Sequence, residues 1–191
     1  AGIGNFIGLC PDAFNARFMA VELDPTTSAI AQYLYPESQH LNTGFQNSNI
    51  RAGGIDVVVG NPPFGQQSLF DPDFPELRRF SIHNYFLAKS IDLLREGGVA
   101  AFVVSRYFMD ALDPAAREQI ARKADFLGAI RLPETAFRRN ALTDVTTDIV
   151  FFQKNTGEKK YSQDWVQTGK LLVKDLKNGG QRFADVNSYF V

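Results

Sequence analysis

Short apolar runs alternate along this chain with segments that have the periodicity of amphipathic helices. The run Ile55–Gly60 is almost entirely apolar and β-branched, which is typical of a central parallel strand that is covered on both faces. Ser81 can cap a helix that reaches about Arg95, because apolar residues recur at helical spacing until Gly97 and Gly98 stop it. The same reasoning predicts strands at 18–22, 99–104, 126–132 and 149–152, and a helix at 114–123.

Helices placed between apolar strands predict an α/β fold with a mostly parallel sheet and right-handed crossovers. With 191 residues, of which 45% are hydrophobic, the chain can bury a sizeable core. The single cysteine, Cys10, excludes a disulfide framework, and no metal cluster is suggested. The sequence shows no secretory signal and no apolar stretch of bilayer-spanning length, so we expect a cytoplasmic protein without membrane contacts.

The tetrapeptide Asn61-Pro62-Pro63-Phe64 directly follows the run Ile55–Gly60. Each proline fixes its own φ and forces the preceding residue to be extended, so the tetrapeptide forms a stiff corner. Since neither proline has an N–H, the Asn61 side-chain oxygen and the Pro62 carbonyl stay available as acceptors. Ligands of open α/β sheets bind beyond the carboxyl ends of strands, and this loop is therefore predicted to hold a flat, amine-bearing substrate. The alternative is a plain turn, because such dipeptides are common in loops.

Glycines at the start of the chain precede a strand that ends in an acid. Gly2 and Gly4 allow the backbone to approach a ligand closely, and Glu22 can accept hydrogen bonds from ribose hydroxyls. The spacing departs from the dinucleotide-binding fingerprint, since the third glycine is Gly8 and the fingerprint needs a small residue at Ile7. A nucleoside-bearing cofactor is predicted, with an ordinary tight turn as the alternative.

A glycine loop, an acid-ended strand and Asn-Pro-Pro-Phe, in this order, resemble the S-adenosylmethionine-dependent amino-methyltransferases, above all the N6-adenine DNA methyltransferases in their gamma arrangement. The resemblance covers residues 1–154. It implies a doubly wound, mostly parallel seven-stranded α/β sheet with an antiparallel strand near one edge, which lacks its first strand in this chain. The last strand is expected to insert between the fifth and sixth. The implied cofactor is S-adenosylmethionine.

The resemblance places the cofactor against Gly2, Gly4, Glu22, Asp24, Phe45 and Gln46. The glycines line its methionine part, and Glu22 holds the ribose, with Asp24 as the second candidate. The family often has an acidic residue for the adenine amine after its third strand, whereas this chain has Gln46 near that place. The Gln46 carbonyl and the Phe45 ring are the expected substitutes.

The resemblance also implies a set of catalytic residues, which are Asn61, Pro62, Pro63, Phe64 and Phe137. Asn61 and Pro62 accept hydrogen bonds from the adenine amine, which favours a pyramidal nitrogen whose lone pair points at the sulfonium methyl group, so no general base is required. Phe64 and Phe137 cover the two faces of a base flipped out of DNA. A core position is the alternative for Phe137.

Other polar residues receive structural interpretations. His40 and His83 are expected to be structural or solvent-facing, because the mechanism does not use them. The arginine pairs at 78–79 and 138–139 are candidates for phosphate contacts, although a solvated surface is favoured for both. With a net charge of −1, the chain also lacks the excess of basic residues that is typical of a self-sufficient DNA-binding protein.

We predict a methyltransferase-like catalytic domain at 1–154 and a polar extension without an assigned role at 155–191. Because the chain begins inside the glycine loop, we expect a piece of a larger protein, similar to the methylase region of large helicase–methylase proteins, whose other domains recognise DNA. Three functions are compatible with these residues: an N6-adenine DNA methyltransferase, a methyltransferase that acts on RNA or a protein glutamine amide, and a catalytically inactive methylase-like module.

Overall fold

The computed structural model describes residues 1–137, 146–157, 163–175 and 181–191. The strands are β1 (Met19–Glu22), β2 (Gln39–Asn42), β3 (Ile55–Gly60), β4 (Leu94–Ser105), β5 (Ala124–Arg131), β6 (Thr147–Lys154), β7 (Thr168–Asp175) and β8 (Gln181–Asn187). The α-helices are α1 (Asn5–Gly8), α2 (Pro25–Leu34), α3 (Ile82–Leu93), α4 (Arg106–Asp110) and α5 (Ala115–Ala121). Short 3₁₀-helices are η1 (Asp12–Phe14), η2 (Phe45–Asn47), η3 (Pro75–Arg79), η4 (Glu134–Phe137), η5 (Asp164–Val166) and η6 (Ser188–Phe190). None of the helices described is long and apolar enough to cross a lipid bilayer.

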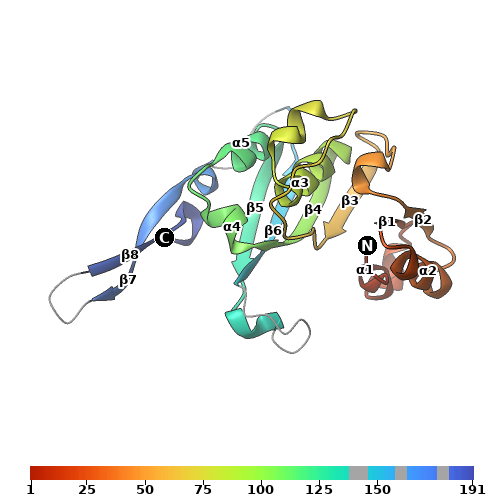
Figure 1. Cartoon of the computed structure of the whole chain (residues 1–191), viewed down its shortest axis with the longest axis horizontal. Helices are drawn as coiled ribbons and strands as arrows, with labels where there is room; N and C mark the ends of the chain where they lie inside the picture. Colours follow the sequence, from red (N-terminus) through yellow and green to blue (C-terminus); the bar gives the residue numbers. More distant parts are fainter. Residues whose placement is uncertain (138–145, 158–162, 176–180) are drawn as a thin grey trace.

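The strands form a parallel pair, a four-stranded sheet and a hairpin (Figure 1). β1 pairs with β2 in parallel, and the four-stranded sheet has the order β3-β4-β6-β5, with β3 and β4 parallel. β6 runs antiparallel between β4 and β5, as the resemblance predicts. A hollow of about 360 Å³ lies between the starts of β1 and β2 and the start of β3. Within the described residues, the predicted seven-stranded sheet is thus represented by two separate sheets.

Local sequence signals place the elements around the proposed site. β3 coincides with the predicted run Ile55–Gly60. α3 begins after Ser81, whose hydroxyl accepts a hydrogen bond from the Asn84 N–H at 3.4 Å. The helix ends at Leu93, earlier than predicted, because Leu94 already pairs with Ile55 of β3.

The hydrophobic core lies on one face of the four-stranded sheet and contains residues of α3, α4 and α5. Phe102 and Phe152 on this face are at most 3% exposed. On the opposite face, Val57 and Val59 of β3 are 59% and 43% exposed. The prediction that β3 is covered on both faces is therefore wrong for the described chain, in which the helices that follow β3 and β4 pack on one side only.

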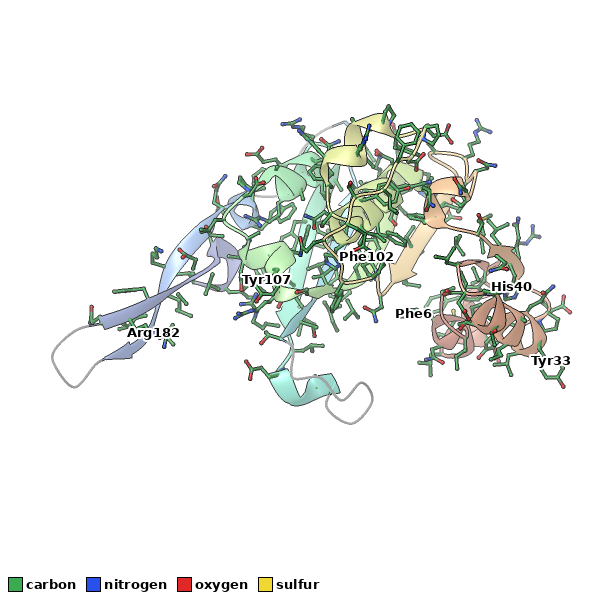
Figure 2. The ribbon with its side chains drawn as sticks, in the orientation of Figure 1. Phe6, Tyr33, His40, Phe102, Tyr107 and Arg182 are labelled. Carbon is green, nitrogen blue, oxygen red and sulfur yellow. The ribbon has the colours of Figure 1, made fainter. Side chains whose placement is uncertain are left out.

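Residues beyond 154 extend the same core. Trp165 of η5 is 2% exposed, and its ring stacks on Phe126 with the centroids 4.9 Å apart. The segment for which the sequence predicts no element forms the β7–β8 hairpin, and Figure 2 shows Arg182 of this hairpin at the opposite end of the molecule from Tyr33 of α2. The division of the chain at residue 154 stays a prediction.

Candidate active site

The Asn61-Pro62-Pro63-Phe64 loop leaves the carboxyl end of β3. Pro62 is buried, whereas Asn61 is exposed and the Phe64 side chain is 49% exposed. In the described part of the chain, neither the Asn61 amide nor the Pro62 carbonyl has a hydrogen-bond partner. The Asn61 amide and the Phe64 ring are therefore exposed at the end of this strand, next to a Pro62 carbonyl that has no hydrogen-bond partner among the described residues.

His83 of α3 supports this loop from below the surface. It is 7% exposed, its Nδ1 lies 3.2 Å from the Pro63 carbonyl oxygen, and its ring meets that of Phe64 edge-on with 5.1 Å between the centroids. Burial lowers the pKa of His83 below its ordinary 6.5, although the hydrogen bond to Pro63 acts in the opposite direction. A neutral ring that donates from Nδ1 keeps Nε2 as an acceptor, and this buried atom has no partner among the described residues.

Gly65 lets the end of the tetrapeptide approach α3. A Cβ at this position would lie 2.9 Å from Cγ2 of Ile82, which is closer than real Cβ contacts come. The Ile82 N–H donates to the Gln67 carbonyl at 2.6 Å and holds the loop against the start of the helix. A larger residue at 65 would require the Gln67 and Ile82 side chains or the loop itself to shift.

The glycine loop and Glu22 meet at the end of β1. Gly4 has φ 92°, in the left-handed region that favours glycine, and it caps α1. Glu22 accepts hydrogen bonds from the Gly2 N–H at Oε2, at 2.8 Å, and from the Asp24 N–H at Oε1, at 3.0 Å. Burial acts to raise the pKa of Glu22, whereas its hydrogen bonds, among them those from the Asp24 and Gly2 N–H groups, hold the pKa below its ordinary value. The carboxylate is therefore ionised at neutral pH.

The other acidic candidate, Asp24, has a structural task. Its Oδ2 accepts a hydrogen bond from the Thr27 N–H at 2.6 Å, so it caps the start of α2. The hydrogen bonds from Thr27 also lower the pKa of Asp24. Asn42 of β2, which no sequence pattern singles out, donates from Nδ2 to the carbonyls of Glu22 and Leu23 at 2.9 and 3.1 Å. Of the two acids, Glu22 is the better placed for a ligand.

Phe45 and Gln46 lie in η2, which follows β2. The Phe45 ring packs against Phe86 and Tyr85 of α3, with centroid distances of 4.8 and 6.2 Å. Both η2 residues are half-buried. η2 is thereby attached to the same helix that supports the tetrapeptide.

The remaining candidates are only partly described. Phe137 ends η4, and its side chain lies outside the described part, as do residues 138–139. Arg79 donates to Gln119 at 3.4 Å and stacks on Phe80, and Arg78 lies over Phe70. The arginine pair of η3 is therefore in contact with neighbouring protein side chains. In the described ranges, no three His, Cys, Asp or Glu side chains are grouped to hold a metal ion.

Two curated proteins illustrate what the chain is similar to. It is 29% identical over 143 residues to the defense against restriction protein B of Escherichia phage P1, a match that covers 73% of this chain and 6% of that protein. It is also 29% identical over 111 residues to the type I restriction enzyme EcoEI methylase subunit of Escherichia coli, with 56% of this chain and 22% of that protein covered. The chain thus spans only a small part of the length of either relative.

Solved structures share the fold. The crystal structure of a Listeria monocytogenes protein, assigned as a class I S-adenosylmethionine-dependent methyltransferase, superimposes with a TM-score of 0.63 at 19% identity. The superposition covers 84% of this chain and 53% of that one. The chain therefore has the α/β fold of class I methyltransferases.

A family model locates the similarity along the chain. The model of the Eco57I restriction-modification methylases matches residues 16–134, which is more than half of the chain. The matched span contains Glu22, the tetrapeptide at the end of β3 and the helix α3 that supports it. The chain belongs to the Eco57I restriction-modification methylase family.

Proposed function

We propose that this chain transfers a methyl group from S-adenosylmethionine to the exocyclic N6 amine of adenine in DNA. The observation that carries the proposal is a pair of acceptors, Asn61 Oδ1 and the Pro62 carbonyl, that have no hydrogen-bond partner among the described residues, on a loop whose next carbonyl accepts a hydrogen bond from His83. Membership of a restriction-modification methylase family supports DNA as the substrate.

The residues around Glu22 fit the cofactor. A Cβ added at Gly2 would meet no atom within 4 Å, so the backbone there is open to a ligand. Glu22 is ionised, and Oε1 receives a single hydrogen bond, which leaves it a lone pair for a ribose hydroxyl. When bound, S-adenosylmethionine supplies a methyl group activated by the positively charged sulfur. Glu22 would hold the ribose and the glycine loop the methionine part, and together they would position the methyl group.

The tetrapeptide acts on the amine. The two acceptors accept hydrogen bonds from its two N–H groups, which localises the nitrogen lone pair and stabilises the positive charge that develops on nitrogen. After the transfer, the methylated nitrogen releases one of its protons to solvent. Such acceptors need no deprotonated base, in agreement with the hydrogen bond that commits His83 Nδ1 to Pro63. The exposed Phe64 ring stacks on the flipped base, an interaction worth about 1–3 kcal/mol.

DNA binding calls for more than this chain. Its net charge of −1 provides little phosphate attraction. The two curated relatives, a protein that defends against restriction and a type I methylase subunit, are several times longer than the matched region. We assign DNA recognition and base flipping to further domains or subunits of the assembly in which this chain works.

The proposal predicts that Asn61→Ala lowers kcat at least about a hundredfold, the usual effect of removing one preorganised hydrogen-bonding group, with S-adenosylmethionine affinity unchanged. The measurement is transfer of labelled methyl groups by the intact protein to DNA, RNA and protein pools. Asn155→Ala is the matched control. This amide donates to the Arg122 carbonyl and follows the end of β6 that lies away from the tetrapeptide. Unchanged methylation by Asn61→Ala would remove the catalytic assignment. Label found only in RNA would identify an RNA amine as the substrate in place of adenine in DNA, and label found only in protein would identify a glutamine amide. No label in any pool would favour a catalytically inactive module.

A further inference from the structure

A buried ion pair lies behind the proposed active site. Asp71 and Lys89 are 1% and 2% exposed, and Lys89 Nζ donates to Asp71 Oδ2 at 2.8 Å. The Tyr85 hydroxyl donates to the same carboxylate oxygen at 2.5 Å. Lys89 also donates to the backbone carbonyl of Phe45 at 2.7 Å. The Tyr85 hydroxyl, the Asp71 carboxylate and the Lys89 ammonium group thus each have a hydrogen-bond partner inside the protein.

Aromatic rings enclose the lysine. Its Nζ lies 4.8 Å from the centroid of Phe45, 5.3 Å from that of Phe74 and 5.9 Å from that of Tyr85. These distances are within the range of cation–π attraction. A buried ion pair of this kind adds little stability over an apolar set of equal volume, because desolvation offsets the attraction. The ion pair instead fixes the relative orientation of the segments that it joins, since each hydrogen bond holds its partner at a defined angle.

The cluster joins three segments that are distant in the sequence. Lys89 and Tyr85 belong to α3, Asp71 lies on the loop that continues from the tetrapeptide, and Phe45 opens η2. The contacts of Lys89 bridge 44 residues to Phe45 and 18 residues to Asp71. η2 is the proposed wall for the cofactor's adenine, and the loop is the continuation of the proposed catalytic segment.

We infer that Lys89 is a positioning residue that sets the cofactor wall at η2 relative to the catalytic loop, through the Phe45 carbonyl and Asp71. This inference rests on the proposed function for its consequence, because only a bound cofactor and amine give the relative position a meaning. The coupling itself is a property of the protein alone and is measured without either ligand.

The test compares three variants of the full chain. The double variant Lys89→Met/Asp71→Asn removes both charges together, so no unpaired charge stays buried. Tyr85→Phe removes one hydrogen bond to Asp71 and leaves Lys89 in contact with Phe45. The control Lys154→Met removes a partly buried cation, 18% exposed, that also donates to a carbonyl of α3, at Ile91, while Asp92 keeps Lys123 at 2.7 Å.

The first readout is amide hydrogen exchange without ligands. We expect the double variant to exchange about tenfold faster at residues 44–48 and 65–74, the two segments released from Lys89, while β4 and β6 keep their rates. Tyr85→Phe should affect 65–74 alone, and Lys154→Met neither segment. Faster exchange throughout the molecule, or the same pattern in the control, would reduce the cluster to a contribution to stability and overturn the inference.

The second readout is the affinity for S-adenosylmethionine, measured by calorimetry. A displaced η2 should weaken binding by the double variant on the order of tenfold, since small misplacements of positioning groups are costly. Local loosening with unchanged affinity would overturn the positioning role. If the unmodified protein binds no S-adenosylmethionine, the proposed function fails, while the exchange data still decide whether Lys89 couples the two segments.

Discussion

His83 joins α3 to the proposed catalytic tetrapeptide through one hydrogen bond to the Pro63 carbonyl and an edge-on contact with Phe64. His83→Leu removes the donor and lets the loop sample other positions. We expect kcat to fall about tenfold or more, because a small displacement of the two acceptors is enough to slow the chemical step. The affinity for S-adenosylmethionine should stay unchanged. Steady-state methylation kinetics measure this, with His83→Gln as the variant that restores a donor and part of the activity. Equal kcat values for all three proteins would contradict a positioning role.

A comparison of the natural sequence with His83→Leu also reports on the charge of His83. Burial holds the pKa of His83 in the folded protein below the ordinary 6.5, so His83 binds a proton more readily in the unfolded chain. The stability that neutral His83 contributes is therefore complete above pH 6.5 and is lost as the pH falls through the folded-state pKa. Thermal unfolding followed from pH 8 to pH 5 should show a steeper acid loss for the natural sequence than for His83→Leu.

Sequence reasoning finds the candidate site residues that belong to a recognisable motif and misses those that no motif marks. Asn61 to Phe64 are contiguous and follow a recognisable strand, so the order of the residues alone indicates their chemistry. His83 and Asn42 reach their partners across 20 residues, and nothing in their spacing marks the contacts. A lone histidine inside a helical pattern is ambiguous until its neighbours are known.

At the scale of single elements, β6 presents two adjacent phenylalanines to opposite faces of the sheet. Phe152 is fully buried and touches Phe126 and Trp165, whereas Phe151 pairs with Ala101 on the face outside the core. We expect Phe152→Ala to lower the free energy of unfolding by about 3–5 kcal/mol and Phe151→Ala by about half of that or less, since it removes less buried area. Urea denaturation of both variants measures the difference. Equal losses would show that the second face is also covered in solution.

Hydrophobic periodicity predicts the elements that pack on the core and fails where both faces meet solvent. β3, α3 and α5 lie where the apolar pattern places them, because burial of one face or stripe dictates that pattern. In the β7–β8 hairpin, Leu171 and Leu172 point to opposite faces and are 42% and 44% exposed. A two-stranded ribbon of this kind imposes no alternation, and the sequence consequently gives no signal for it.

At the scale of the whole molecule, buried polar side chains fasten the last segment to the sheet. The Arg117 guanidinium, 1% exposed, donates to the carbonyls of Val166, Phe108 and Ala111 at 2.6 to 2.8 Å. Asn187 is fully buried and donates from Nδ2 to the carbonyls of Met109 and Trp165. These contacts connect α4, α5, η5 and β8 in one network.

Removal of residues 155–191 tests the division at residue 154 directly. We expect the shortened chain to lose its cooperative unfolding transition, because the deletion takes Trp165 out of the core and leaves the Arg117 guanidinium without one of its three carbonyl partners. Denaturation followed by near-ultraviolet circular dichroism measures this. Phe183→Ala, on the hairpin and 51% exposed, is the control and should change stability by less than about 0.5 kcal/mol. A shortened chain with the unfolding midpoint of the intact one would establish residues 1–154 as an autonomous domain, whereas its collapse would make the C-terminal segment a structural part of the methylase fold.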